Sequence, residues 1–171
     1  MKKQILIPTA ISSVRIAALP LFLYLFDTGN ITACLALMAF CAATDFFDGY
    51  FARKLNVTSK FGAYYDAVTD FVLMSGAFAT FTVDGFYPAW LLVLIAASFV
   101  QFLATSRMTK KLYDPVGRYI GSALYIGIAL TLLSPTQPVF SFVQYAFAGF
   151  FLVSLVSRII SLARNHNPKV K

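Results

Sequence analysis

Six apolar stretches, each about as long as a bilayer is thick, constrain the fold of this sequence more than any other feature. A helix needs roughly 20 predominantly apolar residues to cross the hydrocarbon core of a membrane. The chain has such stretches at 8–27, 31–53, 62–83, 88–106, 117–134 and 139–163. It is 59% hydrophobic and 12% charged, whereas soluble domains are about 45–50% apolar and about 25% charged. The sequence therefore predicts one all-α integral membrane domain over residues 1–171, a bundle of six transmembrane helices.

The short connections and the basic residues predict how this bundle is oriented in the membrane. Short turns make neighbouring helices antiparallel, and turn residues occur at Asp27-Thr28-Gly29-Asn30, Asp84-Gly85, Asp114-Pro115 and Ser134-Pro135. All 14 Lys and Arg residues then fall on one side. Basic residues mark the cytoplasmic side, so we expect cytoplasmic N- and C-termini in a multi-pass protein of the cytoplasmic membrane. Topology and attraction to anionic lipids explain the net charge of +7, and no nucleic-acid binding is expected.

Four aspartates lie in the second and third apolar stretches, near the predicted cytoplasmic ends. Asp45 and Asp48 are three residues apart and Asp66 and Asp70 are four apart, so each pair shares a helix face. A carboxylate at the centre of a membrane helix costs about 2.5–3.5 kcal/mol. At 1.5 Å per residue, Asp48 and Asp66 lie roughly 6–8 Å deep, and Asp45 and Asp70 roughly 12 Å deep. On antiparallel neighbours the four acids form two matching levels.

Carboxylates placed in this way repel one another unless a cation lies among them. Their oxygens are hard ligands that suit Mg²⁺, Mn²⁺ or Ca²⁺, and a zinc site is not expected. Mg²⁺ is often held by a few carboxylates while phosphate oxygens complete its coordination. The pattern favours a divalent metal site that opens to the cytoplasm and acts on a phosphorylated lipid precursor. Gly49, Ala52 and Gly62 leave room for a ligand, although small residues equally serve close helix packing.

The spacing of these residues resembles the signature of the CDP-alcohol phosphotransferase family. Eight fixed positions agree with it, in the order Asp45-x2-Asp48-Gly49-x2-Ala52-Arg53-x8-Gly62-x3-Asp66-x3-Asp70. The segment that opens the chain is similar to the Pro-Asn-x-Leu-Thr-x-x-Arg opening of the bacterial phosphatidylglycerophosphate synthase branch. Pro8, Ser12 and Arg15 fall in register there, with Ser12 standing for Thr and Thr9 for Asn.

This resemblance implies a metal-dependent transferase of phospholipid biosynthesis. In such a reaction a CDP-linked lipid, CDP-diacylglycerol or a CDP-archaeol-type ether lipid, gives its phosphatidyl group to an alcohol and releases CMP. By the same resemblance the four aspartates bind one or two Mg²⁺ or Mn²⁺ ions, and Asp70 also takes the proton from the attacking hydroxyl. The nucleotide would contact Gly49, Ala52, Arg53 and Gly62. The family likeness also suggests a homodimer.

The acceptor is expected to meet basic residues between the fourth and fifth helices. Arg107, Lys110, Lys111 and Arg118 lie there, and they could hold a phosphate on the acceptor. Glycerol 3-phosphate is the preferred acceptor on this reasoning, with inositol phosphate, inositol or serine as alternatives. The lysines could equally be topology markers. Arg15, inside the first helix, is either an anchor that reaches the membrane surface or part of the headgroup pocket.

Two other classes of protein fit the composition. Carboxylates in membranes commonly mark ion paths, which would make the chain a cation or proton transporter. However, the acids lie at one end of two helices and no polar residues continue towards the other face. A structural membrane protein that uses the acids only for assembly would not need the Gly and Ala spacing. The enzyme is therefore the preferred hypothesis.

Overall fold

The computed structural model describes the backbone of residues 2–54, 60–109 and 118–166. It describes the side chains of residues 13–44, 62, 64–104, 119–157 and 159. Within these ranges every regular element is an α-helix and no strand occurs. The helices are α1 (Lys2–Asp27), α2 (Ile31–Lys54), α3 (Lys60–Val83), α4 (Ala89–Thr109), α5 (Arg118–Leu133) and α6 (Gln137–His166).

The prediction of an all-helical chain with six helices is confirmed, and most predicted boundaries lie within three residues of those observed. The largest difference is at the start, where α1 begins at Lys2 instead of residue 8. At the other end α6 continues to His166 instead of stopping at 163. The end of α6 differs because the helical backbone continues through polar residues beyond the apolar part that hydropathy marks. At the start of α1 the helix includes the apolar residues Ile5–Ile7 and the polar residues before them.

Two glycine turns fix the ends of α1 and α3. Gly29 and Gly85 adopt φ angles of 71° and 79°, in the left-handed region that glycine enters without steric cost. At the first turn the Asn30 amide donates to the Leu25 carbonyl, and the Gly29 amide donates to Phe26. The second turn repeats this pattern with Phe86 and Gly85 as donors. These are Schellman motifs, which stop a helix and reverse the chain.

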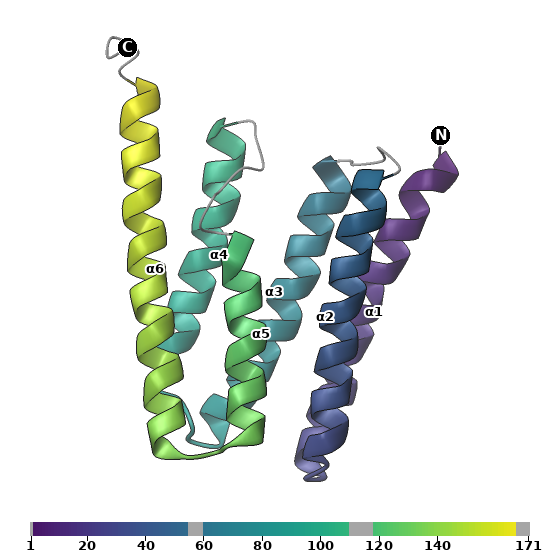
Figure 1. The fold of residues 1–171 in the computed structure, drawn as a ribbon, viewed down its shortest axis with the longest axis vertical. Helices are drawn as coiled ribbons and strands as arrows, with labels where there is room; N and C mark the ends of the chain where they lie inside the picture. Colours follow the sequence, from purple (N-terminus) through teal and green to yellow (C-terminus); the bar gives the residue numbers. More distant parts are fainter. Residues whose placement is uncertain (1, 55–59, 110–117, 167–171) are drawn as a thin grey trace.

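The helices run up and down, so that the starts of α1 and α3 lie at one end of the bundle together with the end of α6 (Figure 1). We call this end the terminal end, and the end with the α1–α2, α3–α4 and α5–α6 turns the turn end. Helix α3 is central and packs against α1, α4 and α5. Helix α1 also packs against α2, and α6 against α4 and α5.

The closest of these approaches is between α1 and α3. A Cβ atom built on Gly76 would lie 2.3 Å from the Cδ1 atom of Leu19. Glycine has no side chain, so Leu19 can occupy the space beside Gly76. Small residues commonly bring membrane helices together in this way. Gly76 thereby makes room for Leu19 between the two helices that carry the site described below.

The outer faces of the bundle are apolar. Val93, Ile126 and Leu152 are 66%, 60% and 59% exposed, and they lie on three different helices. Exposed large apolar side chains on several helices suit a lipid environment. Among the described residues, Tyr64–Val83 and Gln137–Ser157 are long and apolar enough to cross a membrane. The described parts of α2, α4 and α5 contain shorter apolar runs, Ile31–Thr44, Ala89–Ala104 and Tyr119–Leu133.

Candidate active site

An arginine and two aspartates form an ion-pair cluster between α1 and α3. Arg15 comes from α1, and its side chain is only 1% exposed. Its Nη1 atom donates a hydrogen bond to Oδ1 of Asp66 and lies 3.1 Å from Oδ1 of Asp70. Asp66 and Asp70 are one turn apart on α3, with 35% and 23% of their side chains exposed. A single guanidinium nitrogen thus contacts both carboxylates.

This contact answers the question that the sequence left open for Arg15. A side chain that is 1% exposed does not reach the membrane surface, so the anchor interpretation is wrong. A buried guanidinium is tolerated only when anions compensate its lost hydration. Asp66 and Asp70 supply that compensation, and Arg15 in turn offsets the repulsion between them. From the sequence alone, only a bound metal was expected to offset that repulsion.

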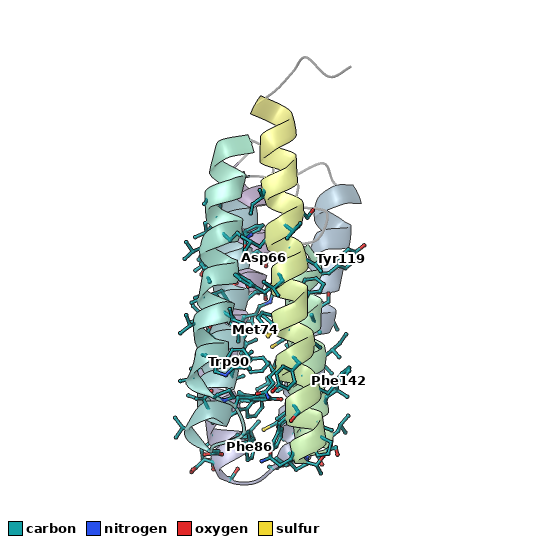
Figure 2. The ribbon with its side chains drawn as sticks, turned by 90° about the vertical axis from the view of Figure 1, so that its left-hand side faces the viewer. Asp66, Met74, Phe86, Trp90, Tyr119 and Phe142 are labelled. Atoms are coloured by element: carbon teal, nitrogen blue, oxygen red, sulfur yellow. The ribbon has the colours of Figure 1, made fainter. Side chains whose placement is uncertain are left out.

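The local register of α3 explains why the two acids face α1. Gly62, Asp66, Asp70, Leu73 and Ala77 follow one another at steps of three or four residues, which keeps them on one helix face. Leu73 and Ala77 are fully buried. The acids therefore continue the buried face of α3 towards the terminal end. Figure 2 shows Asp66 in the half of the bundle nearer the terminal end and Phe86 close to the turn end.

Among the described residues, helix α2 packs against α1 and α5 and not against α3. Its buried residues Cys34, Met38 and Cys41 also follow steps of three or four, and positions 45 and 48 continue that register along the helix. Cys41 is 1% exposed and belongs to this buried face. Position 45 is one turn beyond Cys41. The side chains of Asp45 and Asp48 lie outside the described residues, so the two matching levels of carboxylates remain a prediction.

A second polar contact joins α1 and α3 beside the ion pairs. The hydroxyl groups of Ser13 and Tyr65 lie 2.8 Å apart. Two further polar atoms are buried on other helices, Nε2 of Gln101 in α4 and the hydroxyl of Tyr125 in α5. Sequence reasoning did not select these four residues. Their only signal was a polar group inside an apolar stretch, which does not reveal the partner.

The remaining predicted site residues fall on helix ends at the terminal end. Gly62 lies in the first turn of α3, one turn before Asp66. The last turns of α2 contain Gly49, Ala52 and Arg53, α4 ends two residues after Arg107, and α5 begins at Arg118. Apart from Gly62, the side chains of these residues are outside the described part, as are Lys110 and Lys111 altogether. The fold brings the ends of α2, α3, α4 and α5 to one end of the bundle (Figure 1).

The donor set suits a hard divalent cation. One oxygen of Asp66 and one oxygen of Asp70 point at the same place, and the Nη1 atom of Arg15 lies there. Two convergent carboxylate oxygens are the usual start of a Mg²⁺ or Mn²⁺ site. The side chains described here contain no group of three or more His, Cys, Asp or Glu. A complete metal site therefore needs donors from elsewhere, such as the predicted Asp45 and Asp48.

A helical bundle with exposed apolar side chains and paired carboxylates in one half is typical of a membrane protein with a polar site. Comparison with known families gives this class a name. The CDP-alcohol phosphatidyltransferase family matches residues 5–164, nearly the whole chain. The chain belongs to this family, as the spacing of its aspartates predicted.

Similar proteins occur in enterobacteria, and each of the following is named CDP-diacylglycerol–glycerol-3-phosphate 3-phosphatidyltransferase. The proteins of Pectobacterium atrosepticum and Yersinia enterocolitica are 36% identical over 100 residues, which cover 57% of this chain and 54% of each relative. The chain thus spans about half the length of these relatives. The Escherichia coli protein is 28% identical over 173 residues, covering 93% of this chain and 92% of the relative.

Proposed function

We propose that the chain transfers the phosphatidyl group of a CDP-linked lipid to glycerol 3-phosphate and releases CMP. The observation that carries this proposal is the convergence of Asp66 and Asp70 on one cation within a chain of the CDP-alcohol phosphatidyltransferase family. The names of the similar bacterial proteins support CDP-diacylglycerol as donor and glycerol 3-phosphate as acceptor.

The proposed topology has six membrane-spanning helices, with both termini and the site on the cytoplasmic side. All 14 basic residues belong to the terminal half in this arrangement, which favours a cytoplasmic terminal end. Water-soluble CMP and glycerol 3-phosphate would then enter and leave from the cytoplasm. The lipid donor would reach the site from the bilayer, past the apolar outer faces of the helices.

In the proposed site Asp45, Asp48, Asp66 and Asp70 hold one or two Mg²⁺ or Mn²⁺ ions. Bound metal would neutralise charge on the pyrophosphate and on the departing CMP. Asp70 accepts the proton of the attacking hydroxyl. A carboxylate held by a guanidinium is a weaker base, so Asp70 acts best when its contact with Arg15 is released.

The small residues Gly49, Ala52 and Gly62 would admit the nucleotide close to the helix backbones, and Arg53 would contact its phosphates. Arg118, Arg107, Lys110 and Lys111 would hold the phosphate of the acceptor. Arg118 begins α5 at the terminal end, where its forked guanidinium suits a phosphate group. A homodimer is part of the proposal, and the family likeness alone supports it.

An assay of CMP release tests the proposal. Purified protein is supplied with CDP-diacylglycerol, Mg²⁺ or Mn²⁺, and in turn glycerol 3-phosphate, inositol phosphate, inositol or serine. We expect metal-dependent CMP release with glycerol 3-phosphate and almost none after Asp45→Asn or Asp66→Asn. Asp84→Asn is the matched control, because Asp84 is exposed in the turn after α3. Full turnover by Asp66→Asn, or no release with any acceptor, would reject the proposal.

Arg118→Ala tests the acceptor site. We expect a higher KM for glycerol 3-phosphate and little change in the KM for CDP-diacylglycerol, since only the acceptor loses a charged partner. An unchanged acceptor KM would remove Arg118 from the site.

A further inference from the structure

We propose that Arg15 is an internal counter-cation that competes with the divalent metal for Asp66 and Asp70 and leaves these carboxylates when the metal binds. The inference rests on the metal site of the proposed function and adds a competition to it. It starts from the cluster itself, in which one nitrogen of Arg15 contacts an oxygen of each carboxylate. A metal held by both acids would use these same two oxygens, so it would compete with the nitrogen for them.

Burial makes this competition strong. Arg15 is 1% exposed, so water does not screen its charge as it would at a surface. Even if the metal took the other oxygen of each carboxylate, it would lie within a few ångströms of the guanidinium. Two cations at that separation repel each other, and the burial of Arg15 limits the screening by water. The metal and the Arg15 contact therefore oppose each other through charge as well as through shared atoms.

The position of the competitors on different helices gives the exchange a structural consequence. Arg15 links α1 to α3 through its contacts with Asp66 and Asp70. A metal held by these two carboxylates would not make this link. The Ser13–Tyr65 contact and the close approach of Leu19 to Gly76 do not involve the carboxylates, so α1 and α3 stay packed when the ion pairs are released.

Removing the positive charge of Arg15 should therefore tighten metal binding. In the metal-free protein Arg15→Gln leaves the carboxylates without this partner, so that state becomes less stable. The metal-bound state loses a repulsive neighbour. We expect the Kd for Mn²⁺ to fall by on the order of tenfold, within the usual range of coupling between two ligands. A structural clamp that holds the carboxylates in place for the metal would give the opposite change.

The experiment titrates purified protein with Mn²⁺ and measures free Mn²⁺ by electron paramagnetic resonance, without lipid or nucleotide. It compares wild type, Arg15→Gln and Arg15→Lys with Arg164→Gln, which removes a cation near the end of α6. We expect the Kd order Arg15→Gln below Arg15→Lys below wild type, with Arg164→Gln equal to wild type. The Arg15→Lys variant keeps a charge but loses the guanidinium, so it is expected to fold even if Arg15→Gln does not.

Thermal unfolding provides a second readout. Without metal, Arg15→Gln should melt below wild type, and saturating Mn²⁺ should raise its Tm more than it raises that of wild type. An unchanged or weaker Mn²⁺ affinity in both Arg15 variants would overturn the competition, while CMP release by wild type would leave the proposed function standing. Absence of Mn²⁺ binding by wild type would overturn both the competition and the metal site.

Discussion

The two ends of this bundle are stabilised in different ways. At the terminal end α1 and α3 are joined by the ion pairs of Arg15 and by the Ser13–Tyr65 contact. At the turn end the same two helices meet through aromatic rings. Phe26 and Phe81 have centroids 5.4 Å apart, and Phe86 stacks on Phe140 of α6 at 4.9 Å.

This difference separates stability from chemistry. An aromatic cluster needs no polar partner, and its packing holds the helices together whatever is bound elsewhere. A buried cluster of charges depends on its partners, because an uncompensated buried charge is costly. The turn end therefore relies on packing and the terminal end on charge compensation. Substitutions at the two ends should have separable effects on activity and on unfolding.

The largest expected effect is that of Asp70→Asn on activity. Loss of the carboxylate that we propose as metal ligand and base should lower CMP release by about 10²–10⁴-fold. The unfolding temperature should change little, because Arg15 keeps its bond to Asp66. CMP release and thermal unfolding are measured on the same preparation, with Asp84→Asn as control. A large loss of stability with normal turnover would reverse the comparison between the ends.

Phe81→Ala should show the opposite behaviour at the turn end. Phe81 is fully buried, and its ring contacts Phe22 and Phe26 of α1. Its removal in a soluble core would cost about 3–5 kcal/mol. We expect a loss of about 2–3 kcal/mol in the free energy of unfolding here. In lipid the transfer free energy of the side chain contributes less, while the cost of the cavity remains. Unfolding in mixed micelles measures the loss. Turnover per folded molecule should stay within about twofold, and a much larger loss would show that the ends are coupled.

Gly76→Ala tests the region between the two ends. The added methyl group would meet Leu19 at 2.3 Å, so Leu19 must rotate or α1 must move away. Overpacking of this kind costs about 1–3 kcal/mol. Because Leu19 is one turn from Arg15, a displaced α1 should also lower activity. Ser75→Ala is the control, as it adds no volume at the neighbouring position. Unchanged activity with lower stability would show that Leu19 alone absorbs the strain.

Tyr87→Phe should have the smallest effect. Thr131 donates its hydroxyl proton to the Gly127 carbonyl at 2.7 Å, so Tyr87 is the donor in its 2.6 Å contact with Thr131. Loss of this bond should cost about 1 kcal/mol. Burial also raises the pKa of Tyr87 above the ordinary 10.0. Ionisation of this tyrosine therefore favours unfolding as the pH rises past 10.0, and stability is retained below it.

The pH dependence can be measured by thermal unfolding between neutral and alkaline pH. Wild type should lose stability more steeply above pH 10 than Tyr87→Phe. Parallel curves would show that Tyr87 ionises equally easily in the folded and unfolded protein.

Much of the fold could be predicted from the sequence because each element has a local cause. Apolar stretches of bilayer length indicated the six helices, and the Gly29 and Gly85 turns lay where turn residues interrupt them. The spacing of Asp66 and Asp70 placed both on one face of α3, since helical register needs no knowledge of neighbours.

The partner of these acids could not be predicted in the same way. Arg15 and Asp66 are 51 residues apart, and their contact depends on how α1 packs against α3. No local sequence pattern predicts how the two helices pack. Gly76 favours it, but glycine is frequent in membrane helices whether or not another helix packs against it. The placement of Asp45 and Asp48 opposite the α3 acids stays a prediction, because it depends in the same way on the packing of α2.

The burial of Arg15 also has a consequence for how the chain enters the bilayer during synthesis. Its first helix leaves the ribosome with a guanidinium whose neutralising acids are made 51 and more residues later. A lone arginine partitions poorly into lipid. In the proposed six-span topology, α1 would enter lipid more easily once α3 has emerged, because Asp66 and Asp70 then neutralise its guanidinium.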